Sequence, residues 1–88
     1  MTLPEAVAFG RAVEPYRPMI LEDPVPPDNV DTMAEVASKI GVPIATGERA
    51  IDLRECEVLM ARHVCQYIRP DVCAVGGITT SKKIAALA

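Results

Sequence analysis

Three acidic residues follow short apolar runs at nearly regular intervals. Glu22 ends the run "MIL" at 19–21, Glu48 follows "VPIAT" at 42–46, and Asp71 ends "CQYIRPD" at 65–71. The first two acids lie 26 residues apart and the last two lie 23 apart. Carboxylates held together repel one another unless a cation neutralises them, and a hard divalent ion such as Mg²⁺ prefers oxygen ligands. The spacing therefore favours a Mg²⁺ site, whereas each acid alone would be read as a solvated loop residue or as the partner of a helix N-terminus.

The elements that must position these acids alternate between helix and strand. Apolar spacing and capping residues predict four helices: Leu3 to Val13, Asp28 or Asn29 to Ile40, Asp52 to Val64 with a capping box, and one beginning at a Thr or Ser after Gly77. The intervening apolar runs predict about three short strands. This order is typical of an α/β fold built from consecutive βα units with a parallel sheet. Since the carboxyl ends of parallel strands meet at one edge, the three acids should converge there.

Composition excludes several other classes of protein. The 88 residues are enough for one domain, and nine basic against twelve acidic residues give a net charge of −3. No Lys/Arg-rich stretch could follow a phosphate backbone, so we expect no nucleic-acid partner. No apolar run reaches the roughly 18 residues that a membrane span needs, and the N-terminus lacks signal-peptide features. We therefore expect a cytoplasmic protein whose three cysteines, Cys56, Cys65 and Cys73, remain free thiols.

Two longer stretches carry a family resemblance. "ILEDPVPPDNVDTMAEVASKIGVPIATGER" and "IRPDVCAVGGIT" resemble the barrel domain of the enolase superfamily, in the mandelate racemase/muconate lactonizing enzyme subgroup. The resemblance extends from Tyr16 to Ala88 and is strongest to sugar-acid dehydratases such as galactonate dehydratase. It implies that residues 1–88 form a fragment of the C-terminal domain, with the fold of a partial (β/α)₈ TIM barrel.

The resemblance also implies roles for individual residues. Glu22 and Glu48 match metal ligands, and Asp71 matches the acid that orients a catalytic histidine on the next strand. The implied reaction is that of a Mg²⁺-dependent lyase. It removes a proton next to the carboxylate of a sugar acid, the metal stabilises the ene-diolate, and water is lost. Asp23 stands where a second Glu is more common, and we expect it to neighbour Glu22 without binding the metal.

The remaining candidates have simpler interpretations. Arg49 could hold a substrate carboxylate, but we expect it to form a salt bridge at the surface or beside the site. His63 is predicted to lie within a helix away from the strand ends, so it is rejected as the catalytic base. Solvent-facing or turn positions are expected for Lys82, Lys83, Gly76 and Gly77.

Three strands cannot close a barrel, so we expect these 88 residues alone to be inactive. The third metal ligand, the base and the oriented histidine would lie outside them. The chain would then form a homo-oligomer or require the missing barrel segments. Two alternatives remain open: a racemase, epimerase or cycloisomerase of the same superfamily, and a non-catalytic α/β module that self-associates.

Overall fold

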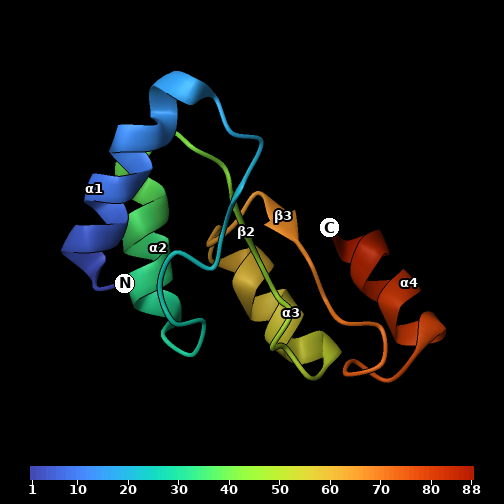
Figure 1. Cartoon of the computed structure of the whole chain (residues 1–88). Coiled ribbons are helices and arrows are strands. Elements are labelled where there is room, and N and C mark those ends of the chain that lie inside the picture. The colour runs from blue at the N-terminus through green and yellow to red at the C-terminus, as the bar shows by residue number, and fades with distance from the viewer.

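The computed structural model describes residues 1–88 and contains four α-helices, one short 3-10 helix and three strands (Figure 1). In chain order the elements are α1 (Leu3–Val13), η1 (Glu14–Tyr16), β1 (Leu21–Glu22), α2 (Val30–Lys39), β2 (Ile44–Thr46), α3 (Leu53–Ala61), β3 (Tyr67–Ile68) and α4 (Ile78–Leu87). None of these helices has the length and apolar character needed to cross a membrane.

The three strands form one parallel sheet in the order β1-β2-β3. Glu22 is the register partner of Ala45, which in turn is the partner of Tyr67. A helix joins each strand to the next, so the predicted α/β fold with a three-stranded parallel sheet is confirmed. The strands are shorter than the apolar runs predicted, and β2 begins directly after Pro43, whose nitrogen cannot donate to the ladder.

The hydrophobic core lies between one face of the sheet and the helices. Ile44 on β2 is fully buried and packs in one cluster with Met33 of α2 and Cys56 of α3. In Figure 1, β2 runs in front of α3, while α1 packs on α2 and α4 packs on α3. Ala45 is outside the core cluster because successive strand residues face opposite sides. The row formed by Glu22, Ala45 and Tyr67 therefore lies on the sheet face away from the helices.

Side-chain caps fix where the helices begin. Of the two candidates for α2, the structure selects Asn29, whose side chain accepts a hydrogen bond from the Thr32 amide at 3.0 Å. Asp52 caps α3 as predicted, accepting from the Glu55 amide at 2.8 Å. The Glu55 carboxylate accepts from the Ile51 amide rather than from the Asp52 amide, so the reciprocal half of the predicted capping box is displaced by one residue.

Two helix boundaries differ from the prediction. The third helix ends at Ala61, and His63 lies in the following turn with a positive φ of 51°, not inside the helix. A left-handed residue of this kind ends a helix because it reverses the backbone. The last helix has Gly77 at its N-cap with no side-chain cap, so the prediction of a Thr or Ser cap was wrong. Ser81 instead lies inside the helix and donates to the Gly77 carbonyl at 2.9 Å.

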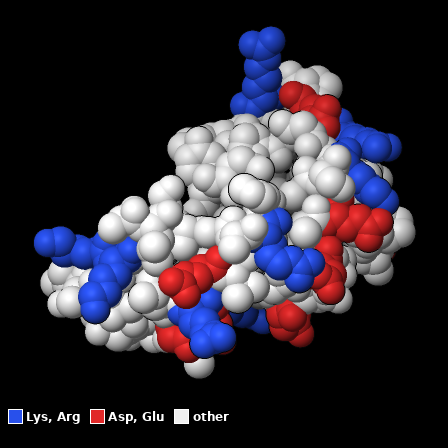
Figure 2. All heavy atoms as spheres, turned by 180° about the vertical axis from the view of Figure 1, so that it is seen from behind, with Lys and Arg blue, Asp and Glu red and all other residues white.

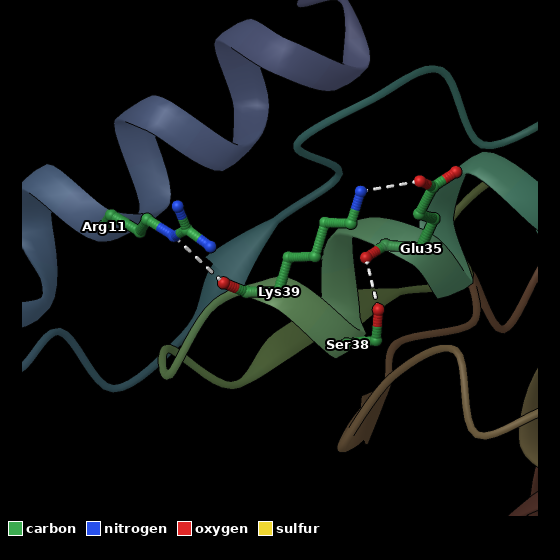
Figure 3. Close-up of polar contacts among 4 residues, drawn as sticks. All are labelled: Arg11, Glu35, Ser38 and Lys39. Carbon is green, nitrogen blue, oxygen red and sulfur yellow. Dashed lines mark hydrogen bonds and ion pairs between the residues drawn. The ribbon is translucent and has the colours of Figure 1, made fainter.

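Polar contacts at the C-terminal end of α2 join it to α1 (Figure 3). Arg11 Nε of α1 donates to the Lys39 carbonyl at 3.2 Å, and Lys39 Nζ reaches back to Glu35 Oε1 at 2.7 Å. The last carbonyls of a helix have no partner within it. Arg11 supplies one and so fixes α1 against the end of α2.

Candidate metal centre at the strand ends

Three carboxylates gather at the carboxyl end of the sheet. Glu22 is the last residue of β1, Asp23 follows it, and Glu48 lies two residues beyond the end of β2. Each offers an oxygen atom, and these atoms lie within 4.8 Å of one another. The structure thus brings the two predicted metal ligands together and adds Asp23 to them.

Backbone pairing holds Asp23 in place. Its amide donates to the Ala45 carbonyl at 3.0 Å, which continues the β1–β2 ladder past Glu22. Its φ of 42° is in the left-handed region, which Asp tolerates better than most residues. The buried Thr46 hydroxyl donates to Asp23 Oδ1 at 2.5 Å. One oxygen of Asp23 is thereby engaged with β2.

Glycine is required between β2 and Glu48. Gly47 has a φ of +125°, which other residues rarely adopt. A Cβ there would lie 2.9 Å from Ile68 Cδ1 and 3.1 Å from the Arg69 amide nitrogen. Only a residue without a side chain leaves room for Ile68 and Arg69 here. Gly47 therefore allows the chain to turn from β2 towards Glu48.

The donor set fits a hard divalent cation. All three groups are carboxylates, and Mg²⁺ takes oxygen ligands at about 2.0–2.1 Å, which places opposite ligands about 4.2 Å apart. The spread of up to 4.8 Å is close to this value, and Glu22 and Glu48 are exposed enough to rotate. Glu22 and Glu48 could therefore hold Mg²⁺ after small side-chain movements, with Asp23 beside them.

The cationic side chain of Arg69, the residue after β3, contacts the cluster formed by Glu22, Asp23 and Glu48. Arg69 donates from Nη1 to Glu22 Oε1 and forms an ion pair with it across β2. Arg69 was not among the site residues predicted from the sequence. A signal was present, because Arg69 precedes Asp71 by two residues and alternation along an extended segment places both on one side.

Asp71 lies apart from the acidic cluster but shares a hollow with Glu48. Glu48, Arg69 and Asp71 line this open hollow of about 450 Å³ together with Ile68 and Pro70. Asp71 Oδ1 accepts a hydrogen bond from the Cys73 amide at 2.9 Å, which holds the carboxylate over the turn after β3. An acid in this place could orient a histidine by accepting from one imidazole nitrogen.

Other candidate residues lie outside this centre. Arg49 takes part in none of the three ion pairs, so the expected surface or neighbouring salt bridge was wrong. It lines a second hollow of about 290 Å³ with Asp28 and Glu55.

The three cysteines are free thiols, as predicted. On the face in Figure 2, basic and acidic side chains are interspersed without a patch of one sign.

Comparison with known proteins gives a consistent result. The family model described as "Enolase C-terminal domain-like" matches residues 1–88. A D-galactonate dehydratase family member of Pantoea ananatis is 38% identical over 80 residues, which are 91% of this chain and 19% of that protein. A D-gluconate dehydratase of Thermoproteus tenax is 36% identical over 94% of this chain and 17% of its own length.

Solved structures agree with this match. L-talarate dehydratase from Polaromonas sp. JS666, complexed with Mg and L-glucarate, superposes with a TM-score of 0.94 at 34% identity, covering 100% of this chain and 25% of that one. A racemase from Streptomyces coelicolor with bound magnesium gives a TM-score of 0.96 at 32% identity, with coverage of 100% and 26%. The chain spans about a fifth of the curated relatives named above. The predicted partial barrel is thus confirmed as the fold.

Proposed function

Because the chain belongs to the enolase superfamily, in the mandelate racemase/muconate lactonizing enzyme subgroup near the sugar-acid dehydratases, we propose that residues 1–88 provide part of the barrel domain of a Mg²⁺-dependent sugar-acid dehydratase. The observation that supports this most is the convergence of Glu22, Asp23 and Glu48 within 4.8 Å at the strand ends. The L-talarate dehydratase neighbour was solved with Mg and L-glucarate, which are the metal and the class of substrate proposed here.

In this proposal Glu22 and Glu48 hold the metal. Bound Mg²⁺ supplies positive charge that stabilises the carboxylate of the substrate as it gains electron density. Asp23, with one oxygen engaged by Thr46, fixes the position of the adjacent Glu22. Asp71 orients a histidine that lies on a neighbouring strand of the complete barrel, because the only histidine in these residues, His63, follows α3.

The net reaction is the loss of water from a polyhydroxy acid. A base takes the proton from the carbon beside the carboxylate, and the electron pair left behind moves into the carboxylate to give an ene-diolate. When this pair returns, a double bond forms to the next carbon, whose hydroxyl leaves with a proton as water. The resulting enol becomes a 2-oxo acid. The chain's acids serve the first of these steps, in which negative charge accumulates on the substrate carboxylate.

A racemase is the second candidate, and the magnesium-bound racemase among the structural neighbours favours it. Both reactions begin with the same proton abstraction and use the same metal ligands. They diverge in whether the proton returns or water leaves. Incubating this chain, assembled with the remaining strands of a barrel, with sugar acids in D₂O distinguishes them, since a racemase exchanges deuterium into recovered substrate and a dehydratase accumulates 2-oxo acid.

Pairing at the sheet edges also belongs to the proposal. β1 and β3 each have one neighbouring strand within these residues, so each leaves one edge open. We propose that further strands of the barrel, or a second copy of the chain, cover these edges. The free thiols are consistent with a cytoplasmic location.

A Mg²⁺ titration by calorimetry tests the metal site directly. The full chain should bind Mg²⁺, and Glu48→Gln should weaken binding at least tenfold because a neutral amide replaces a charged ligand. Glu57→Gln on the exposed side of α3 is the matched control and should bind like the wild type. Equal affinity of Glu48→Gln and wild type would overturn the assignment of Glu48.

A further inference from the structure

The ion pair between Arg69 and Glu22 places a positive charge at the acidic cluster formed by Glu22, Asp23 and Glu48. Three carboxylates lie within 4.8 Å of one another, and the guanidinium of Arg69 is the one cation that the ion pairs place on them. Asp23 has a hydrogen bond from Thr46, whereas Glu48 has neither a hydrogen bond nor an ion pair through its side chain. Arg69 is therefore the group that offsets the repulsion within the cluster.

We propose that Arg69 is a built-in counter-ion of the acidic cluster and that Mg²⁺ must displace it from Glu22 to bind. This inference rests on the proposed function and adds a residue that sets the metal affinity of the site. Glu22 cannot hold a divalent ion and keep its contact with a guanidinium without bringing two cations close together. Their Coulomb repulsion at this distance opposes the binding of either one in the presence of the other.

The position of Arg69 gives it somewhere to move. Its side chain is 54% exposed, and it follows β3 at the edge of the hollow that Glu48 and Asp71 also line. Leaving Glu22 therefore exposes no buried charge and needs only rotation of a flexible side chain into this hollow. Once displaced, Arg69 can turn towards Asp71, which lines the same hollow and is not a metal ligand in this proposal.

The test compares Mg²⁺ affinity in charge-changing variants of the full chain. Arg69→Gln should bind Mg²⁺ roughly tenfold more tightly than the wild type, since the competing cation is gone. Arg69→Lys keeps the charge and should stay within about threefold of the wild type. Arg62→Gln is the matched control, because Arg62 is about as exposed as Arg69 and forms an ion pair with Asp31 outside the site, so the Mg²⁺ affinity of this variant should not change.

A second readout separates the counter-ion role from a merely structural one. Without metal, Arg69→Gln should unfold at lower urea concentration than the wild type, because the carboxylates lose their neutralising partner. Saturating Mg²⁺ should abolish or reverse this difference, since the variant that binds more tightly gains more stability. A structural role for Arg69 would leave the difference in place at all Mg²⁺ concentrations.

The failures of the two proposals can be distinguished. If wild type and Arg69→Gln bind Mg²⁺ with equal affinity, or the variant binds more weakly, the counter-ion inference is overturned and the metal site stands. If neither the wild type nor any variant binds Mg²⁺, the proposed metal function fails and the inference fails with it.

Discussion

At the scale of single residues, the acidic cluster is held unevenly. Glu22 is paired with Arg69 and Asp23 with Thr46, whereas the Glu48 side chain has no polar partner. A carboxylate without a partner can bind a metal without breaking an existing contact. In the proposed site, substitution of Glu48 therefore reports most directly on metal binding, and Glu22 is the ligand at which Mg²⁺ would compete with Arg69.

Gly47 should be intolerant of even one added methyl group. Gly47→Ala would put a Cβ 2.9 Å from Ile68 Cδ1 and strain a backbone with φ of +125°. We expect a loss of about 1–3 kcal/mol in the free energy of unfolding, measured by urea denaturation, together with weaker Mg²⁺ binding. Gly77→Ala is the control, because it has φ of +100° and open space. Equal losses in both variants would mean that crowding against β3 contributes nothing.

Burial raises the pKa of the Cys56 thiol above its ordinary value of 9.0, and the charges of Asp52 and Glu55 raise it further. A raised pKa in the folded state means that the contribution to stability is complete below pH 9 and is lost as the pH rises through the folded pKa. We expect the free energy of unfolding to fall above pH 9, and to fall less steeply in Cys56→Ala. Cys73→Ala, which removes an exposed thiol, should follow the wild type. Parallel curves for all three proteins would contradict this assignment.

At the scale of elements, local signals located the helices well and their boundaries less well. The range Leu3 to Val13 was predicted and is observed as α1, because Thr2, Pro4 and Glu5 all favour a helix start there. The end of α3 was missed because His63 adopts a left-handed conformation, which His favours more than most residues but still adopts only in a minority of cases. Strand lengths were overestimated because pairing in the sheet, not apolar character, decides where a strand ends.

The N-cap of α2 offers a test at this scale. Asn29→Ala should lower the free energy of unfolding by about 1 kcal/mol, because it removes the hydrogen bond to the Thr32 amide. Asp28→Ala changes an adjacent exposed residue whose side chain makes no hydrogen bond, and it should have little effect. Urea denaturation of both variants measures the difference. A larger loss in Asp28→Ala would show that the cap is misassigned.

At the scale of the whole molecule, the parallel order β1-β2-β3 turns acids 26 residues apart in sequence into neighbours. The convergence of Glu22 and Glu48 could be predicted because each follows a strand and parallel strands end at one edge. The contact of Arg69 with Glu22 could not, since it depends on how far a long side chain reaches across β2. Sequence spacing therefore located the cluster but not the cation that neutralises it.

The most direct measurement maps a bound ion onto the fold. Mn²⁺ is a paramagnetic substitute for Mg²⁺ in an oxygen site and broadens the NMR signals of nearby amides. When Mn²⁺ is titrated into the full chain, the amide signals of Asp23, Gly47 and Glu48 should broaden first and those of α1 should stay sharp. In Glu48→Gln this selective early broadening should disappear. Broadening that begins elsewhere on the chain, or none at all, would contradict a metal centre at the strand ends.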